Sequence, residues 1–337
     1  MTHSKPSFEE NQKIRDMAAL VTTLEGDFFP TGTYNLFRKR VFQVLELREE
    51  RLKKGITEQK GAALIGPAGV GKSHMAEQVV VEYAEWVKAS GGREFGSKIV
   101  SVIVPAKATV IATCNAILRA LGYPIVSSRT EDYLVTLVTI HLREHRIAAL
   151  HLDEVQDSGR HKTSDSIETY AKRFRNMMQD KEWPICLIMT GTLEGRRFIN
   201  HDGTLTRRLK PVEILPMTYE HEGLLLRKAV LWFLERVDLT HGGLLDQTEF
   251  IRILMHAGAY RFGMAIEIAI EAIGEAKSES ASEITVDHFA EAYFVRMNCD
   301  DELNPFYTPA WKGIDTTIAM DRYLDDRKAT RKRPKSK

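Results

Sequence analysis

The chain has 337 residues, 43% of them hydrophobic, and a formal net charge of only +1. A chain of this length and apolar content can bury a full core, which indicates a globular protein. Its near-neutral net charge gives no sign that the molecule as a whole binds a polyanion. The cysteines Cys114, Cys186 and Cys299 are scattered and show no metal-binding spacing, so neither a disulfide framework nor a zinc site is expected. The polar start and the lack of a long apolar run predict a soluble, cytoplasmic protein without a membrane span.

Residues 1–57 are expected to form an N-terminal extension that includes one amphipathic, heavily charged helix at 35–54. Apolar residues along this helix are expected to face the core, while its Arg and Lys side chains form the solvated face. The expected buried stripe consists of Leu36, Val41, Val44, Leu45 and Leu52.

Between residues 58 and 216, short apolar runs rich in β-branched residues alternate with stretches of helical spacing, such as 72–90 and 165–180. The expected strands are 61–66, 98–105, 146–153, 184–191 and 211–216. Strands that are apolar on both faces and alternate with helices indicate an α/β domain at 58–216, with a parallel sheet covered by helices.

After Pro216 the pattern changes to consecutive helices, expected at 219–237, 246–257, 261–276 and 285–297. They predict a small helical domain at 217–300, followed by a tail at 301–337. The last eleven residues, RKATRKRPKSK, carry seven basic side chains and no acid. This tail is either a solvated, disordered segment or an arm that seeks phosphates and binds them less well as salt rises.

A glycine-rich motif, GPAGVGKS, follows the first expected strand at residues 66–73. It fits the pattern G-x-x-x-x-G-K-[ST] between a strand and a helix, which is the context that a phosphate-binding loop requires. Its glycines let backbone N–H groups turn toward phosphate oxygens, and the helix that begins near Lys72 adds its positive dipole end. Lys72 is expected to reach the β- and γ-phosphates, and Ser73 is expected to ligate Mg²⁺. The expected nucleotide-binding residues are Gly66, Pro67, Ala68, Gly69, Val70, Gly71, Lys72, Ser73, His74 and Asp153.

Two adjacent carboxylates, Asp153 and Glu154, end the apolar strand in RIAALHLDEVQ. A nucleotide site of this kind needs a second strand that ends in an acid holding the Mg²⁺ shell, and Asp153 has that position. Glu154 has the position of a general base that polarises water for attack on the γ-phosphate, or else it is an exposed turn acid. Neighbours on one strand end cannot flank a glycosidic bond, which excludes an acid and base acting on a sugar. His151 is expected to be a packed strand residue.

These two motifs, together with LIMTGT, LTRRL and the helical domain, resemble those of AAA+ ATPases over roughly residues 58–300. The resemblance implies an ATPase that uses ATP and Mg²⁺. It implies an α/β fold in which a P-loop parallel sheet is flanked by helices and followed by a small C-terminal helical lid domain. It also implies that Thr192, or its close competitor Thr190, contacts the γ-phosphate or the attacking water, unless this threonine is a turn residue.

Arginines of the family reach the nucleotide from two further places. The resemblance implies an arginine finger at Arg207 or Arg208 that projects into a neighbouring subunit's nucleotide, unless both are solvated loop residues. Arg261, in the pattern G-x-x-R that begins at Gly258, is implied to return from the lid to the nucleotide.

Within the AAA+ proteins, the motifs look most like the transposition-regulator ATPases of the TnsC/TniB group. This likeness implies ATP-dependent assembly of a homo-oligomeric ring or filament on double-stranded DNA, and regulation of a transposase or target-selector protein. The N-terminal extension and the basic tail depart from the group. A replication-initiator or helicase-loader ATPase stays open as an alternative, as do a P-loop small-molecule kinase and an ATP-dependent scaffold that does not hydrolyse.

Sequence-independent DNA binding needs basic side chains that face phosphates along a groove or a ring pore. The candidates are Lys107 and Thr109 after the second strand, with Arg160, His161 and Lys162 after the Asp-Glu strand as a weaker set. Lys107 can equally be an ordinary surface lysine. No helix-turn-helix or zinc finger is legible, so base-specific reading is not expected.

Overall fold

The computed structural model describes residues 8–106, 109–125, 127–158 and 164–317. The chain divides into two compact units, an α/β unit of residues 30–215 and a helical unit of residues 1–29 together with 216–337. The first helix, α1 (Phe8–Gly26), therefore belongs to the helical unit, and the second, α2 (Gly32–Lys53), belongs to the α/β unit.

The α/β unit is built on a five-stranded sheet in the order β2-β3-β4-β1-β5, and all neighbouring strands are parallel. The strands are β1 (Gly61–Ile65), β2 (Lys98–Ile103), β3 (Ile147–Asp153), β4 (Cys186–Gly191) and β5 (Leu209–Glu213). Every residue of β1, β3 and β4 is buried, as expected for central strands that are covered on both faces. The predicted parallel sheet is confirmed.

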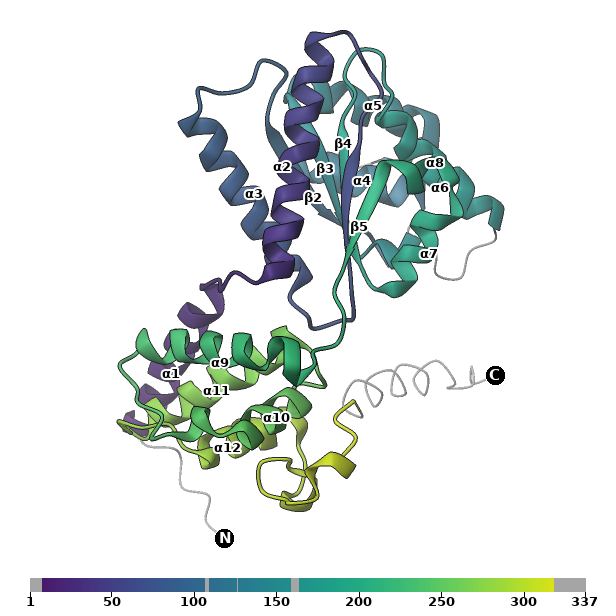
Figure 1. Ribbon diagram of the computed structural model, residues 1–337. Helices are drawn as coiled ribbons and strands as arrows, with labels where there is room; N and C mark the ends of the chain where they lie inside the picture. Colours follow the sequence, from purple (N-terminus) through teal and green to yellow (C-terminus); the bar gives the residue numbers. More distant parts are fainter. Residues whose placement is uncertain (1–7, 107–108, 126, 159–163, 318–337) are drawn as a thin grey trace. The chain divides into compact units, whose positions relative to one another are not determined.

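Helices cover both faces of this sheet (Figure 1), with α2 and α3 (Lys72–Ala89) on one face. The other face carries α4 (Val110–Ala120), α5 (Glu131–Glu144), α6 (Ser164–Met177), α7 (Leu193–His201) and α8 (Gly203–Arg208). A short 3-10 turn, η1 (Val155–Ser158), follows β3. On the second face, Ile117 of α4, Leu150 of β3 and Phe174 of α6 belong to one fully buried core.

The last strand differs from its predicted range of 211–216, because β5 spans Leu209–Glu213. Pro211 lies inside the strand, opposite Ala63 of β1. A proline lacks the backbone N–H that a strand donates to its neighbour, so it is tolerated on an edge strand such as β5. The predicted strand begins at Pro211, and that boundary is wrong.

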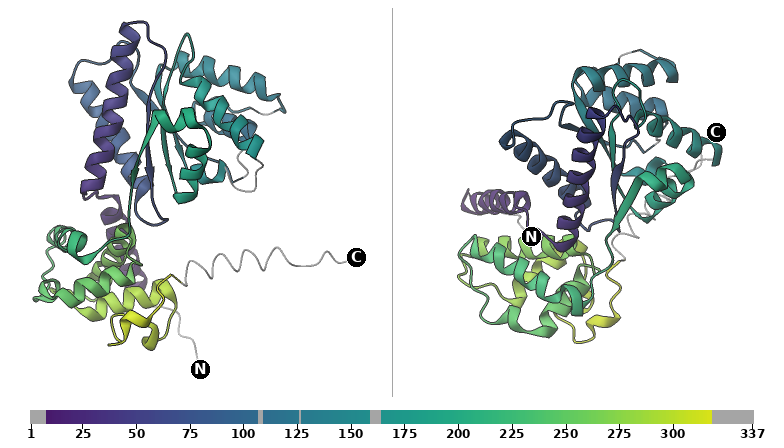
Figure 2. Two further views of the ribbon diagram at one scale, coloured as in Figure 1. Left: turned by 45° about the vertical axis from the view of Figure 1, so that its right-hand side comes forward. Right: turned by 45° about the horizontal axis from the view of Figure 1, so that its top comes forward.

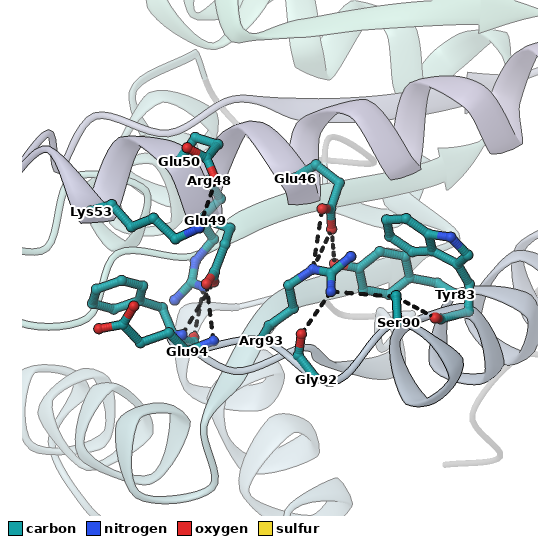
Figure 3. A network of polar contacts seen from close by, with 12 residues as sticks. Glu46, Arg48, Glu49, Glu50, Lys53, Tyr83, Ser90, Gly92, Arg93 and Glu94 are labelled. Atoms are coloured by element: carbon teal, nitrogen blue, oxygen red, sulfur yellow. Dashed lines mark hydrogen bonds and ion pairs between the residues drawn. The ribbon is translucent and has the colours of Figure 1, made fainter.

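Buried charged side chains attach α2 to the rest of the α/β unit (Figure 3). The carboxylate of Glu49 accepts hydrogen bonds from the backbone N–H groups of Glu94 (2.9 Å) and Phe95 (3.1 Å). The guanidinium of Arg48, whose residue is 1% exposed, donates to the carbonyl oxygens of Pro184 (2.8 Å) and Phe95 (2.9 Å). Burial lowers the pKa of Arg48 below its usual range. These bonds tie α2 to the loop after α3 and to the segment before β4.

A third residue of α2, Glu46, completes this attachment. Its carboxylate accepts hydrogen bonds from the hydroxyl of Tyr83 (3.0 Å) and from the guanidinium of Arg93 (2.8 Å), as Figure 3 shows. We call Glu46, Arg48 and Glu49 together the α2 clamp. The clamp makes the charged helix an integral part of the α/β unit.

The buried face of α2 agrees with the predicted stripe at Val41 and Leu45, but Leu36 is 45% exposed and its prediction is wrong. The buried positions of this helix are Tyr34, Phe37, Val41, Leu45, Arg48 and Glu49. They recur at intervals of three and four residues, which puts them on one side of the helix, whereas Leu36 falls beside that face. The aromatic residues Tyr34 and Phe37 take the place that the sequence analysis gave to Leu36.

The helical unit combines α1 with the helices that follow residue 216 (Figure 2). These are α9 (Tyr219–Glu235), α10 (Thr248–Ala257), α11 (Phe262–Ser278) and α12 (Val286–Met297), with the 3-10 turns η2 (Leu244–Asp246), η3 (Asp301–Leu303) and η4 (Trp311–Gly313). Gly274 allows α1 and α11 to approach closely, since a Cβ there would lie 2.8 Å from Cγ2 of Val21. The C-terminal helices that follow the sheet domain in the chain agree with the predicted fold class.

Within the described ranges, none of the helices is by itself both long and apolar enough to cross a membrane. One pair, α10 with α11, meets the criteria of length and composition jointly across a bend of 107°.

Candidate nucleotide-binding site

The glycine-rich loop connects the end of β1 to the start of α3. Gly69 and Gly71 have φ angles of +74° and +90°, a conformation that glycine adopts far more readily than other residues. Gly71 is the N-cap of α3 and, as a glycine, has no side chain with which to cap the helix. Uncapped N–H groups at a helix N-terminus, together with the positive end of the helix dipole, make a binding site for an anion.

Lys72 is 6% exposed, and its ammonium donates to the carbonyl oxygens of Gly66 (3.0 Å) and Pro67 (2.7 Å). The positive charge is therefore held inside the curve of the loop. This is where the phosphates of a nucleotide would need compensation of their negative charge. His74 follows on the first turn of α3 and is half-buried.

Ser73 brings the loop together with the Asp-Glu strand, because its hydroxyl donates to Oδ2 of Asp153 at 2.7 Å. These residues lie 80 positions apart in the chain. A hydroxyl and a carboxylate are hard oxygen ligands of the kind that Mg²⁺ takes, usually with several waters and substrate phosphates. The pair therefore fits a magnesium ion held at the carboxyl ends of β1 and β3.

Behind Asp153 lies a chain of polar side chains on neighbouring strands, of which Thr190 and His151 are buried and Ser101 is exposed. The hydroxyl of Thr190, on β4, donates to Oδ1 of Asp153, and its oxygen lies 2.9 Å from Nε2 of His151. Nδ1 of His151 lies 3.1 Å from the hydroxyl of Ser101 on β2. Burial lowers the pKa of His151 to about 4, so the ring is neutral at pH 7. Because Thr190 gives its only proton to Asp153, Nε2 of His151 carries the ring proton and Nδ1 accepts from Ser101.

Glu154 is half-buried and has a φ of +59°, in the left-handed region that few residues other than glycine adopt. Its carboxylate accepts a hydrogen bond from the side-chain NH₂ of Gln156, whose carbonyl oxygen accepts from the backbone N–H of Thr192 (3.0 Å). An uncommon backbone conformation of this kind is typical of residues in functional sites. Glu154 is therefore a carboxylate held by Gln156 directly after Asp153 in the chain, and its role as general base stays a prediction.

The two threonines proposed to sense the γ-phosphate have different surroundings. Thr190 is fully buried and bonded to Asp153 and His151, so its hydroxyl is already engaged within the sheet. The hydroxyl oxygen of Thr192, at the end of β4, is buried and has no hydrogen-bond partner among the described residues. Thr192 therefore stays the better candidate for a contact with nucleotide or water.

The neighbouring arginines Arg207 and Arg208 also differ. Arg208 is 4% exposed, and its Nη2 lies 3.2 Å from Oε1 of Glu58 within the same α/β unit. Arg207 is exposed at the end of α8. A residue that reaches another subunit must present its side chain at the surface, which makes Arg207 the better candidate for the finger. Arg208, whose Nε and Nη1 have no partner among the described residues, stays the alternative.

Arg261 lies in the helical unit, as the N-cap of α11. The two residues before it, Ala259 and Tyr260, have φ angles of +49° and +57°. Gly258 precedes this turn at a point where a Cβ would lie 2.8 Å from the backbone N of Ala265, so only glycine fits. The G-x-x-R pattern thus corresponds to a tight, unusual turn, and the role of Arg261 toward the nucleotide stays a prediction.

The DNA-contact candidates are only partly visible. Lys107, Arg160, His161 and Lys162 lie outside the described residues. Thr109 is exposed, and its hydroxyl accepts a hydrogen bond from the backbone N–H of Ala112 (3.0 Å) as the N-cap of α4. Its capping bond is sufficient reason for a threonine at this position.

The contributions of Gln156 and Ser101 were not predicted from the sequence, and His151 was expected only to pack in its strand. A polar side chain in a strand that is otherwise apolar must find a hydrogen-bond partner. His151 in IAALHLD carried that signal, because the residues around it predict complete burial. No comparable local signal marked Gln156, which lies in a turn.

Comparisons with known proteins agree with this geometry. The family model described as "AAA domain" matches residues 56–198. Among solved structures, the ORC2 protein of Aeropyrum pernix, determined as ADPNP–ADP complexes, is 14% identical with a TM-score of 0.53, covering 85% of this chain and 78% of that one. The A. pernix ORC1 protein in complex with DNA is 16% identical with a TM-score of 0.52, covering 77% of this chain and 66% of that one.

Comparison with curated proteins finds no match. At these sequence identities, the structural likeness establishes the fold alone, which is that of the ORC proteins. The family match covers the strands that carry the glycine loop and the Asp-Glu pair. Residues 56–198 therefore correspond to an AAA-type P-loop domain.

Proposed function

We propose that this chain is an ATP-hydrolysing switch that binds double-stranded DNA as a homo-oligomer and changes its assembly with its nucleotide state. The observation that carries the proposal is the 2.7 Å hydrogen bond between Ser73 and Asp153, which joins the two halves of a triphosphate site. Glu154, the next residue along the chain, supplies a carboxylate at the same edge of the sheet.

The residues divide the work of hydrolysis among them. Backbone N–H groups of the glycine loop and the ammonium of Lys72 bind the phosphates. Ser73 and Asp153 would hold Mg²⁺, which when bound neutralises charge on the transferring phosphoryl group. Glu154 accepts a proton from the attacking water, and Thr192 contacts that water or the γ-phosphate. Arg207 reaches the nucleotide of the next subunit, so bound ATP strengthens the contact between subunits.

Loss of the γ-phosphate would then weaken the subunit contact, because both subunits hold that group. Hydrolysis acts as a timer for the assembled state. The DNA part of the proposal is supported by the fold shared with the A. pernix ORC1 protein, which was solved in complex with DNA. It is also supported by the basic C-terminal sequence, whose seven cations in eleven residues suit phosphate contacts that weaken with salt.

The test compares the wild type with Lys72→Ala and Glu154→Gln in ATP binding, ATP turnover and DNA binding. Lys72→Ala is expected to lose ATP binding and ATP-dependent assembly. Glu154→Gln is expected to keep ATP binding, lower turnover about 10²- to 10⁴-fold, and prolong the DNA-bound oligomer. Sedimentation and DNA binding at two salt concentrations follow assembly. If neither substitution changes turnover or ATP-dependent assembly, the proposal is wrong.

Two finer functions differ in the partner that the switch serves. A replication-initiator or helicase-loader role is favoured by the shared fold of the two A. pernix ORC proteins. A role as a transposition regulator of the TnsC/TniB type is supported only by the likeness of the sequence motifs. Reconstitution separates them: the first role requires ATP-dependent delivery of a replicative helicase to DNA, and the second requires ATP-dependent stimulation of a transposase.

Two other classes of function predict different results. A small-molecule kinase would stay monomeric with ATP and DNA and would release a phosphorylated metabolite. A scaffold that does not hydrolyse ATP would be unchanged by Glu154→Gln. The multi-helix unit after the sheet, α9 to α12, argues against the kinase, which needs a phosphoryl-acceptor site and an arginine cluster there.

A further inference from the structure

We propose that Gln156 is a positioning residue for hydrolysis, which orients the carboxylate of Glu154 and links it to the end of β4. The inference rests on the proposed ATPase function and adds a residue to that site. Gln156 is 5% exposed, and both ends of its side-chain amide are engaged. Its NH₂ donates to Oε2 of Glu154, and its carbonyl oxygen accepts from the backbone N–H of Thr192 at 3.0 Å.

These two contacts require an amide at position 156. One neighbour is a carboxylate, which only accepts hydrogen bonds, and the other is a backbone N–H, which only donates. The amide satisfies both in one orientation, whereas the flipped orientation would set oxygen against oxygen. A glutamate at this position would face the carboxylate of Glu154 with a second carboxylate, and a methionine would leave both groups without a partner.

The turn that carries Gln156 is closely packed, which restricts the position of this side chain. The preceding residue, Val155, is fully buried. A Cβ added to Gly191 would lie 2.7 Å from Oε1 of Gln156, and one added to Gly195 would lie 2.9 Å from Cγ2 of Val155. Gly191 and Gly195 therefore leave the space that the side chains of Gln156 and Val155 occupy.

The backbone of Glu154 is fixed independently of Gln156. Its N–H donates to Oδ1 of Asp153 (2.9 Å), and its carbonyl oxygen accepts from the N–H of Asp157 (3.0 Å). With the backbone held in the left-handed region, the remaining freedom of Glu154 is the rotation of its side chain. The bond from Gln156 fixes that rotation, and a misplaced general base loses much of its effect on rate.

The contact with Thr192 adds a connection to the candidate γ-phosphate sensor. Thr192 is the N-cap of α7, and its N–H is held by Gln156 while its hydroxyl is not bonded to any described residue. A displacement of the end of β4 by nucleotide would pass through the amide of Gln156 to Glu154. The structure thus connects the proposed sensor and the proposed base through one side chain.

A double-mutant cycle tests this inference with Gln156→Met, Glu154→Gln and the combined variant. Gln156→Met is expected to lower kcat about 10- to 100-fold without changing the KM for ATP or the Kd of a fluorescent ATP analogue with Mg²⁺. In the Glu154→Gln background, the same substitution is expected to change kcat no further, because its effect passes through Glu154. A residue that only stabilised the fold would lower both backgrounds alike.

Gln156→Glu separates the two halves of the amide, since it keeps an acceptor for Thr192 and loses the donor to Glu154. It is expected to lower kcat at least as much as Gln156→Met. The matched control is Gln78→Met on α3, where the lost bond is a glutamine NH₂ donated to Glu82 (3.1 Å) and kcat is expected to stay unchanged.

The outcomes distinguish this inference from the proposed function. If Lys72→Ala and Glu154→Gln abolish turnover but both Gln156 variants bind ATP and turn it over normally, the inference is wrong and the ATPase proposal stands. The inference is also wrong if Gln156→Met lowers kcat by the same factor in the wild type and in the Glu154→Gln variant. Retained binding of the ATP analogue shows that each variant is folded.

Discussion

Two polar networks of the α/β unit contrast in what their groups are arranged to bind. In the α2 clamp, Glu46, Glu49 and the Nε and Nη1 atoms of Arg48 bond to other groups of the protein, including two backbone N–H groups and two backbone carbonyls (Figure 3). Nη2 of Arg48 is buried and has no partner among the described residues. At the carboxyl ends of β1, β3 and β4, by contrast, the groups surround a glycine loop. The N-cap of α3 is a glycine and supplies no side-chain cap, and the hydroxyl of Thr192 has no partner among the described residues.

The difference shows that buried charge does not by itself mark a functional site. Arg48 is more deeply buried than Lys72, 1% against 6% exposed, yet its bonds only connect a helix to its own unit. An unpaired buried atom does not mark one either, because Nη2 of Arg48 has no partner among the described residues. What marks the strand-end site is the combination of the glycine loop, its helix start and the Ser73–Asp153 pair. Substitutions in the clamp should therefore change stability, and substitutions at the strand ends should change turnover.

The largest effect is expected from a substitution of Arg207. This side chain is exposed and could reach another molecule, whereas its neighbour Arg208 is buried in its own unit. Arg207→Ala is expected to lower turnover of the assembled protein about 10³-fold, as for other arginine fingers, while ATP binding by each subunit stays intact. Turnover measured against protein concentration checks this. Mixing Arg207→Ala with Lys72→Ala subunits should restore part of the activity, since each lacks a different half of a shared site.

Arg208→Ala is the matched substitution one residue along. It removes a guanidinium that is 4% exposed and paired with Glu58, so it should lower stability instead of turnover per folded molecule. Loss of turnover from Arg208→Ala with unchanged stability, and no loss from Arg207→Ala, would reverse the two assignments.

Arg48→Met tests the clamp directly. The substitution leaves the carbonyls of Pro184 and Phe95 without their charged donor in a buried setting, so the free energy of unfolding is expected to fall by about 3 kcal/mol. Urea titration followed by the circular dichroism of the helices measures it. Turnover per folded molecule should not change.

The control for Arg48 lies on the same helix. Lys53 pairs with Glu50 at 2.7 Å, but both side chains face solvent, so Lys53→Met should leave the urea midpoint where it is. Equal effects of the two substitutions would mean that burial does not decide the strength of these contacts.

Thr190→Val is expected to change both stability and turnover, because this hydroxyl is fully buried and is bonded to the proposed metal ligand Asp153. It should lower the free energy of unfolding by about 1–2 kcal/mol, since the N–H of His151 loses its acceptor. It should also raise the Mg²⁺ concentration for half-maximal turnover about tenfold. Thr139→Val on α5, whose hydroxyl bonds only to the carbonyl of Val135, is the control for both measurements.

The sequence was sufficient for the parts of the site that are local in the chain. The glycine loop and the Asp-Glu pair each lie within one short segment, and their residue types state their chemistry. The contact between Arg48 and Pro184 joins residues 136 positions apart, and that between Thr192 and Gln156 joins residues 36 apart. Such pairs exist only once the strands are ordered in space, so no pattern within a segment could predict them.

The ends of strands and the buried faces of helices could not be predicted for the same reason. A proline marks the start of a strand only where the strand is central, and whether the strand of Pro211 is central depends on the order of the strands in the sheet. Leu36 is as apolar as Val41, and only the packing of Tyr34 and Phe37 decides that Leu36 is outside. Amphipathic patterns predict that a helix has a buried face, and they locate that face less well than they predict its existence.

The smallest effect is expected in the helical unit, where a buried histidine holds the segment after α12. Nε2 of His256 lies 2.9 Å from the carbonyl oxygen of Ile314 and therefore donates to it, while Nδ1 lies 3.3 Å from the hydroxyl of Tyr260. Burial lowers the pKa of His256, although its hydrogen bonds to Ile314 and Trp311 and the charge of Asp315 oppose this. The neutral ring is thus the form that the folded unit prefers.

The sign of the pH dependence follows from that preference. Below about pH 6.5 the unfolded chain takes up a proton at this histidine that the folded unit resists, so stability falls as the pH drops. Urea titrations of the wild type at pH 7 and pH 5.5 should therefore differ more than those of His256→Asn. An equal pH dependence in both proteins would mean that His256 ionises alike in the folded and unfolded states. A steeper dependence in the wild type would identify a buried polar contact that affects stability alone, as in the α2 clamp.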